Sequence, residues 1–158
     1  MGKDDRMTDN EHGALTWNDV AQCLAPERNY WLCTTNNDGS PHAVPVWGVV
    51  VEANLYLFSE RHTAKVRNVN KDPRVVLHRE SADNVVIVHG QLDDLGAPSI
   101  NPIVLEALGA KYDRESDKSY LPQSDSDLMV IFALRPHRAL LWDLSAFEQS
   151  QRRWISSV

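Results

Sequence analysis

Four side chains that can bind phosphate stand close together in the middle of the chain: Arg61, Thr63, Lys65 and Arg67. If a helix begins at Thr63, its first backbone N–H groups have no partner inside the helix and carry the positive end of the helix dipole. Two guanidinium groups, an ammonium group and a hydroxyl around such amides can hold a phosphate dianion. The alternative is a basic helix that is simply solvated, because runs of lysine and arginine are usually exposed.

The sequence around these residues predicts a strand followed by a short helix. Leucines alternate with Tyr56 and Phe58 over residues 55–59, which is typical of a half-buried strand. Thr63 is a suitable N-cap, and two valines three positions apart then fall on one face of the expected helix. The helix should end before Pro73, because the residue preceding a proline is pushed out of the α region.

A second stretch, upstream, predicts a hairpin with an interrupted second strand. Asn36-Asn37-Asp38-Gly39 is typical of a turn between strands at residues 30–35 and 42–51. Pro45 cannot donate a hydrogen bond to a neighbouring strand, so the second strand must have an edge, a bulge or a gap there. Gly48 permits a bulge or the close approach of a group to the backbone. Both residues would suit the corner of a barrel.

These two stretches together resemble a known family. Residues 61–75 read R-x-T-A-K-x-R-N-x-x-x-D-P-R-V, and residues 34–47 end in D-G-S-P-H-A-V-P-V-W. In this order and spacing they resemble the pyridoxamine-5′-phosphate-oxidase-like superfamily. They are more closely similar to its flavin- and deazaflavin-dependent oxidoreductases of split β-barrel fold. The similarity covers roughly residues 30–92, with weaker echoes toward the C-terminus.

The resemblance implies a bound flavin-type cofactor, either FMN or the deazaflavin coenzyme F420. The phosphate would be held by Arg61, Thr63, Lys65 and Arg67, with Asn68 bracing the start of the helix. The ring would lie in the gap of the sheet near Gly48, lined by Val44, Pro45, Val46, Trp47, Phe58 and Ser59. In this family the cofactor carries the reaction, and the protein supplies binding, orientation and electrostatics.

The resemblance also implies an obligate homodimer with a cofactor site at each subunit boundary. The C-terminal Arg152-Arg153-Trp154 resembles the close of related chains. We therefore expect Arg153, or its neighbour Arg152, to reach toward the cofactor that the other chain mainly binds, with Trp154 beside it. Five tryptophans are more than a small barrel interior readily holds, and tryptophan and arginine are enriched in interface cores.

Two functions from different classes remain open. One is an oxidoreductase that transfers a hydride between its cofactor and a small conjugated organic substrate. The other is a non-catalytic protein that binds or stores a flavin, haem or bilin on the same scaffold, since a fold does not fix a function. The basic motif favours coenzyme F420. The acidic N-terminal tail offers no obvious grip for the oligoglutamate chain of that coenzyme, which favours FMN.

Composition excludes several other classes of protein. The 158 residues suit one domain over residues 14–158, after a charged tail at residues 1–13 that we expect to be disordered. A net charge of −6 argues against binding nucleic acid or a membrane surface. We expect a cytoplasmic protein, because no apolar run is long enough for a membrane helix and the N-terminus is no signal peptide. The six histidines and two cysteines form no metal motif.

The rest of the chain completes the expected fold. Thr16-Trp17-Asn18-Asp19 resembles a capping box that opens a helix to about Leu24, packed as a lid over one end of a barrel. Residues 85–88 are apolar without alternation, so we expect both faces of that strand to be covered. The pattern predicts a mainly β protein, a six-stranded antiparallel barrel of Greek-key type with a few short flanking helices, and the resemblance implies that it is a split β-barrel. The remaining expected segments are strands at 75–78, 85–92, 128–134 and 138–143, a helix at 102–112, a loop at 114–127, a turn at 135–137 and a tail at 147–158.

Overall fold

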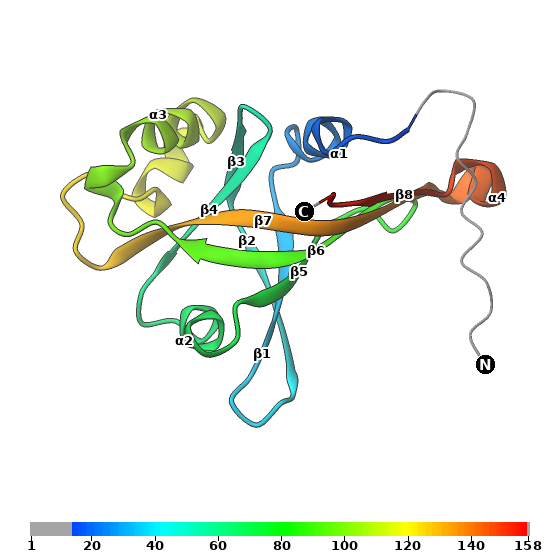
Figure 1. Ribbon diagram of the computed structural model, residues 1–158. Coiled ribbons are helices and arrows are strands. Elements are labelled where there is room, and N and C mark those ends of the chain that lie inside the picture. The colour runs from blue at the N-terminus through cyan, green and yellow to red at the C-terminus, as the bar shows by residue number, and fades with distance from the viewer. Residues whose placement is uncertain (1–13, 158) are drawn as a thin grey trace.

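The computed structural model describes residues 14–157, so the expected disordered tail at residues 1–13 lies outside the described part of the chain. Figure 1 shows one curled antiparallel sheet with short helices around it. The strands are β1 (Tyr30–Thr35), β2 (Pro41–Val46), β3 (Gly48–Val51), β4 (Asn54–Glu60), β5 (Arg74–Arg79), β6 (Asn84–Asp94), β7 (Met129–Asp143) and β8 (Arg152–Ile155). The helices are α1 (Trp17–Leu24), α2 (Ala64–Lys71), α3 (Pro102–Lys111) and α4 (Phe147–Ser150).

The order of the strands shows how the sheet forms a split barrel. It runs β2-β1-β5-β6-β7-β4-β3, with β8 added to β7. The two edge strands, β2 and β3, are consecutive in the chain and are separated by Trp47 alone. The chain therefore passes from one edge of the curled sheet to the other within one residue. Counted together, β2 and β3 complete a six-stranded barrel, which confirms the predicted mainly β fold.

Pro45, which has no N–H group to donate, lies in an edge strand, the part of a sheet that tolerates proline. It sits in β2, an edge of the sheet, opposite Trp31 of β1. The predicted interruption of this strand is present, because pairing with β1 ends at Val46 and pairing with β4 begins at Gly48.

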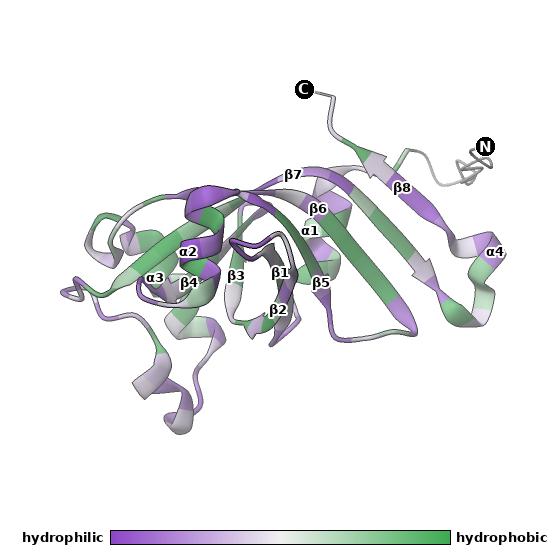
Figure 2. Cartoon of the chain, turned by 90° about the horizontal axis from the view of Figure 1, so that it is seen from below, coloured by the Kyte–Doolittle hydropathy of each residue, from purple (hydrophilic) through white to green (hydrophobic). Residues whose placement is uncertain are grey.

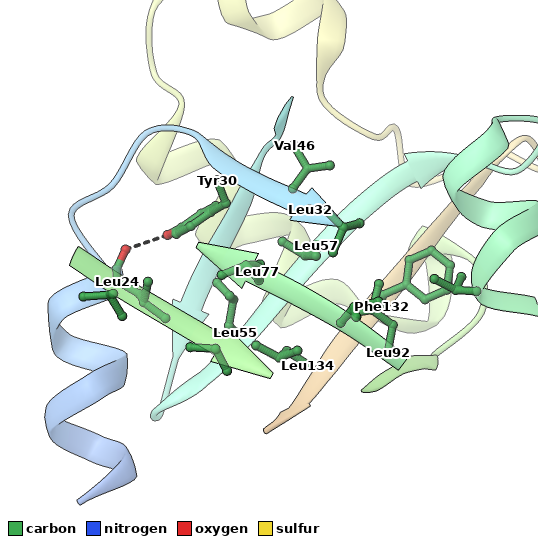
Figure 3. Close-up of a cluster of buried hydrophobic side chains, with 14 of the residues drawn as sticks. Leu24, Tyr30, Leu32, Val46, Leu55, Leu57, Leu77, Leu92, Phe132 and Leu134 are labelled. Carbon is green, nitrogen blue, oxygen red and sulfur yellow. Dashed lines mark hydrogen bonds between the residues drawn. The ribbon is translucent and has the colours of Figure 1, made fainter. Parts of the chain in front are cut away.

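The barrel core is built by alternation along these strands. In β1, Tyr30 and Leu32 point inward and are almost fully buried, and α1 covers one end of the core with Leu24. Figure 3 shows these side chains meeting Leu55 and Leu77, and Figure 2 shows the curl of the sheet with hydrophobic residues along β6 and β7. The Tyr30 hydroxyl donates to the Leu24 carbonyl oxygen over 2.7 Å, which fixes the predicted lid helix to the barrel.

The N-terminal helix has the predicted cap. The Thr16 hydroxyl accepts from the Asp19 N–H, and the Asp19 carboxylate accepts from the Thr16 N–H, forming the reciprocal capping box.

Three expectations for the C-terminal half were wrong. Strand β7 continues through residues 135–137, where a turn was expected, because β6 is long enough to pair with all of it. A register shift between His89 and Gly90 absorbs the irregularity, and Pro136 lies opposite Gly90, where a side chain would collide with the Arg135 carbonyl. The expected tail contains α4 and β8, and the expected loop at 114–127 contains a 3-10 helix at Glu115–Tyr120.

Expected cover on both faces of β6 is largely present within one chain. Val86 and Val88 are buried in the barrel core, and Val85 is buried on the opposite face. Ile87, which shares that opposite face with Val85, is only partly buried.

The side of Gly48 that would carry a Cβ atom faces β4 rather than an open gap, and a ring near its backbone stays a prediction. A Cβ atom at this position would lie 2.5 Å from the Tyr56 carbonyl oxygen and 2.6 Å from Leu57 Cδ2, both in β4. Only glycine therefore lets the start of β3 approach β4 this closely.

We predict that Gly48→Ala destabilises the protein even without any ligand. The added methyl group must displace the backbone of β4, and overpacking of this kind costs about 1–3 kcal/mol. Gly109→Ala is the matched control, because a Cβ atom at Gly109 meets no atom within 4 Å and alanine favours the helix interior. Thermal unfolding should show a lower Tm for Gly48→Ala and an equal or higher Tm for Gly109→Ala. Equal Tm values for Gly48→Ala and the wild type would contradict the close approach.

Candidate functional site

A cavity of about 550 Å³ opens at the break between β2 and β3. One wall comes from the end of β2 and from Trp47, a second from β4 and the start of α2, and a third from the segment that precedes β7. The lining residues are Pro45, Val46, Trp47, Phe58, Ser59, Glu60, Thr63, Lys65, Ser119, Tyr120, Leu121, Gln123, Ser126 and Met129. This volume lies within the usual range of small-molecule sites, about 300–1,000 Å³.

The fold brings together seven of the residues singled out in the sequence. Those that line the cavity are Pro45, Val46, Trp47, Phe58, Ser59, Thr63 and Lys65. Val44, one residue further back in β2, is partly buried against the barrel core and does not line the cavity. A ring-contacting role for Val44 stays a prediction.

Thr63 occupies the N-cap of α2, as predicted, but its side chain does not cap the helix. The Thr63 hydroxyl donates to the Glu60 carbonyl oxygen over 3.0 Å and lies 3.0 Å from the Ser59 hydroxyl. The first amides of α2 are therefore not occupied by this side chain.

Lys65 is the cationic side chain of the cavity wall. Burial lowers the pKa of its ammonium group, and the nearby Glu60 carboxylate opposes that shift. Within residues 14–157, the Lys65 ammonium group makes no hydrogen bond and no ion pair. A half-buried cation without a hydrogen-bond acceptor is incompletely solvated. An anionic ligand group would replace the interactions with water that burial removes.

The other predicted phosphate ligands point elsewhere in this structure. Arg61 lies 3.3 Å from the Asp94 carboxylate, between β4 and β6. Arg67 donates to the His62 carbonyl oxygen over 2.5 Å. Neither residue lines the cavity, so phosphate contacts from both stay predictions.

Asn68 does brace α2, as expected, but against the neighbouring hairpin. It is buried, and its Nδ2 atom donates to Thr34 Oγ1 and to Asn36 Oδ1, each over 3.0 Å. The Lys71 ammonium group adds a hydrogen bond to the Asn37 side chain of the same hairpin. These bonds set the position of α2, and hence of Lys65, relative to β1 and β2.

Arg153 and Trp154 lie away from this cavity within the chain. Both belong to β8, which pairs with the far half of β7. The Trp154 ring packs 5.2 Å from the Trp17 ring of α1, centroid to centroid. Contact of these residues with a cofactor bound by a second chain stays a prediction.

Sequence patterns did not indicate the third wall, residues 119–126, which lies in the segment expected to be an exposed loop. Its anchor is Asp117, which is 3% exposed and forms a two-pronged ion pair with Arg28. These partners are 89 residues apart in sequence, so no local spacing could have revealed the pair.

A polar cluster holds the strand break in place. The Trp47 ring stacks on the Tyr112 ring at 4.4 Å, nearly parallel, and its Nε1 atom donates to Asn29 Oδ1. The Tyr112 hydroxyl accepts from the Gly48 N–H over 3.0 Å. The Lys111 ammonium group donates to the Gly48 carbonyl oxygen over 2.7 Å and to the Tyr30 hydroxyl over 2.9 Å.

Burial within this cluster changes the acidity of its members. It lowers the pKa of Lys111 to about 8, with a further contribution from the charge of Arg28. It raises the pKa of Tyr112 to about 12 and also raises the pKa of Tyr30. The uncharged forms of all three groups are therefore favoured in the fold.

The sequence and the site can now be compared with known proteins. The sequence model of pyridoxamine 5′-phosphate oxidase matches residues 17–143, most of the chain. The chain belongs to the pyridoxamine 5′-phosphate oxidase family. This match extends well beyond residues 30–92, where the resemblance was evident in the sequence, and includes the cavity. No curated protein sequence matches the chain.

Solved structures share the family fold at low sequence identity. An F420 reductase is 22% identical with a TM-score of 0.61, over 75% of this chain and 94% of its own. A conserved hypothetical protein from Mycobacterium tuberculosis is 20% identical with a TM-score of 0.68, over 87% and 91%. A heme binding protein from Mycobacterium smegmatis is 17% identical with a TM-score of 0.67, over 89% of this chain and 58% of its own.

Two other kinds of site find no support within the described part of the chain. Residues 14–157 contain no group of three or more histidine, cysteine, aspartate or glutamate side chains placed to hold a metal ion. None of the helices in this range is long and apolar enough to cross a membrane.

The polar cluster predicts an alkaline rise in stability. The folded-state pKa of Lys111, about 8, lies below its ordinary value of 10.5, so between these values the unfolded chain binds the proton that the folded chain has lost. The free energy of unfolding should therefore increase from pH 8 toward pH 10. Above about pH 10 it should fall, because tyrosines 30 and 112 would ionise in the unfolded chain first.

Urea unfolding of Lys111→Met across pH 7–11 tests this assignment. Loss of the titrating group should remove the rise between pH 8 and pH 10, and the fall above pH 10 should remain. Lys118→Met is the control, since the Lys118 side chain is mostly exposed and the rise should persist. An identical pH profile for Lys111→Met and the wild type would contradict the assignment.

Proposed function

We propose that this protein is an oxidoreductase that binds FMN or coenzyme F420 in the cavity and transfers a hydride between that cofactor and a small conjugated organic substrate. The observation that carries the proposal is the cavity itself. Beside an apolar wall of Val46, Trp47 and Phe58 it holds the Lys65 ammonium group, which has no hydrogen-bond or ion-pair partner among residues 14–157. A flavin-type cofactor has the matching pair of features, an anionic phosphate and a flat, largely apolar ring.

The residues present fit such a group. Lys65, aided by the unoccupied first amides of α2, would hold the phosphate. Val46 and Phe58 would pack against the ring, and Trp47 would hold the end of the ring at the strand break. When bound, the cofactor supplies the hydride chemistry, in which two electrons pass with one hydrogen. Family membership and the structural likeness to an F420 reductase support this choice of cofactor.

A cofactor carrier without turnover is the second candidate. The structural likeness to a heme binding protein favours it. The absorbance spectrum of freshly purified protein separates flavin, deazaflavin and haem from one another. Oxidation of added reduced cofactor in the presence of an electron acceptor then separates an enzyme from a carrier.

We predict that Lys65→Ala weakens binding of FMN or coenzyme F420 about ten- to a hundredfold. A charge-assisted hydrogen bond contributes about 1.5–3 kcal/mol, and about 1.4 kcal/mol corresponds to tenfold in affinity. Thr63→Ala should have a smaller effect, because the Thr63 hydroxyl is uncharged and already bonded to the Glu60 carbonyl. Fluorescence titration of the cofactor measures both changes.

Lys71→Ala is the matched control for this titration. Lys71 lies at the opposite end of α2 and hydrogen-bonds to Asn37, outside the cavity. Its removal should leave the affinity within about twofold of the wild-type value. Unchanged affinity in Lys65→Ala would remove the phosphate assignment.

We also propose that the protein is a homodimer in which the C-terminal strand faces the partner's cofactor. Large apolar side chains remain exposed on and near β8 and on the outer side of β1: Trp31 is 36% exposed, Phe147 45% and Ile155 59%. Tryptophan is enriched in interface cores, and covering such side chains would favour association.

Light scattering should therefore give about twice 17.9 kDa at micromolar concentration. Arg153→Ala should lower cofactor affinity while the dimer remains intact, because its guanidinium group would meet the cofactor of the other chain. Trp31→Glu should produce monomers with weakened cofactor binding. A wild-type monomer that binds cofactor fully would contradict this proposal.

A further inference from the structure

The third wall of the cavity is held in place by a partly buried ion pair. Asp117 lies in the 3-10 helix Glu115–Tyr120, directly before the residues that line the cavity. The Asp117 carboxylate accepts two hydrogen bonds from Arg28, at 3.1 Å from Nη1 and 2.5 Å from Nη2. The planar fork of arginine matches a carboxylate at two points, so this contact fixes orientation as well as distance.

Arg28 reaches the opposite wall at the same time. Its guanidinium carbon lies 4.8 Å from the centroid of the Trp47 ring and 5.4 Å from that of the Tyr112 ring. Its carbonyl oxygen accepts from the Tyr112 hydroxyl over 2.7 Å. One residue, from the turn between α1 and β1, therefore contacts both the wall at the strand break and the anchor of the third wall.

The two walls meet through aromatic rings. The Tyr120 ring stands edge-on to the Trp47 ring at 6.1 Å, with 75° between the planes. Both residues line the cavity, and Tyr120 remains 68% exposed. The packing of Trp47 on Tyr112 holds one member of the pair, and the ion pair with Arg28 holds the segment that carries the other.

The third wall presents no charge to the cavity. Its lining residues are Ser119, Tyr120, Leu121, Gln123 and Ser126. The cationic and anionic side chains of the lining, Lys65 and Glu60, come from the wall formed by β4 and α2. A ligand that lay against the third wall would find aromatic edges and neutral hydrogen-bonding groups, with no partner for a charge of its own.

We propose that Arg28 is a positioning residue that, through Asp117, holds residues 119–126 as a subsite where an uncharged, planar aromatic substrate packs against the contacting rings of Trp47 and Tyr120. This inference rests on the proposed function, because it assigns the substrate side of the same cavity. Arg28 does not line the cavity, so its effect on binding passes through the two walls that it connects.

The anchoring role can be tested on the whole protein without cofactor. Trypsin cleaves after lysine and arginine; Lys118 directly follows Asp117, and Arg114 lies three residues before it. Asp117→Asn and Arg28→Lys should each raise the rate of cleavage at these two sites at least tenfold. Asp93→Asn, which breaks the more exposed ion pair with Arg135, is the matched control and should leave that rate unchanged. Equal cleavage of the wild type and both anchor variants would overturn the anchoring role.

The substrate class is tested by equilibrium dialysis with two planar probes in the presence of saturating FMN. The probes are 2-(hydroxymethyl)anthraquinone, which is uncharged, and anthraquinone-2-sulfonate, which is anionic. The wild type should bind the uncharged probe at least tenfold more tightly. Tyr120→Ala, which truncates an exposed side chain and leaves the ion pair intact, should lose most of this preference while the FMN affinity changes less than twofold.

Each result has a distinct meaning for the two proposals. Equal binding of both probes, or an unchanged preference in Tyr120→Ala, would overturn the subsite. Absence of FMN binding by the wild type would overturn the proposed function with FMN, and the dialysis would then be repeated with coenzyme F420. Arg28→Lys should reproduce the loss of preference seen in Tyr120→Ala, and a full preference in Arg28→Lys would overturn its positioning role.

Discussion

The passage of the chain from one edge of the sheet to the other at Trp47 is the constraint on which the rest of this structure depends. A strand that pairs with β1 through its first half and with β4 through its second half must change neighbours at one point. Where the neighbours change, the backbone pairs with neither β1 nor β4. Its N–H and carbonyl groups there need other hydrogen-bond partners. Here the Tyr112 hydroxyl and the Lys111 ammonium group supply hydrogen bonds to the N–H and carbonyl of Gly48.

This solution explains the place of α3. The helix ends next to the strand break, where it delivers Lys111 and Tyr112. Val104, Leu108 and Tyr112 form a second apolar cluster with Val49 and Ile131, outside the barrel core. The helix is thus fixed on one side by hydrophobic packing and at its end by hydrogen bonds. The cavity follows from the same break, because Trp47 is displaced from the ladder and lines the space beside it.

Sequence patterns predicted those features that depend on neighbours along the chain. Alternation located the strands, and the capping box located the start of α1. Pro45 and Gly48 indicated the interruption correctly, although the close neighbour of Gly48 proved to be β4. The turn expected at Arg135-Pro136-His137 was wrong, because a long partner strand with a bulge at Gly90 overrides the local preference of proline.

The cavity was predictable only in part, because sequence patterns reveal only features that depend on neighbours along the chain. Residues from β2, β4 and the start of α2 were identified, since each belongs to a motif that is continuous in sequence. The wall at residues 119–126 was missed, because its polar composition is that of an exposed loop. Its position beside the cavity depends on one pairing, Arg28 with Asp117, between parts of the chain that share no pattern.

Two lysines with lowered pKa values differ in the hydrogen-bond partners that the fold gives their ammonium groups. Burial lowers the pKa of both Lys65 and Lys111, so that shift alone does not distinguish them. Lys111 donates to the Gly48 carbonyl and to the Tyr30 hydroxyl, and these bonds offset the cost of removing its ammonium group from water. Lys65 has no such acceptor among residues 14–157, so only the charge of the nearby Glu60 carboxylate opposes the effect of its burial.

A half-buried ammonium group without a hydrogen-bond acceptor stabilises the free protein less than it stabilises a complex with an anion. Lys65 and Lys111 differ in their hydrogen-bond partners. This difference indicates that the wall of β4 and α2, which carries Lys65, is the charged side of the cavity. The neutral third wall and the aromatic strand break then form the remaining sides. Such a division suits a ligand whose charge is confined to one end, and it places the least polar part of that ligand beside Trp47.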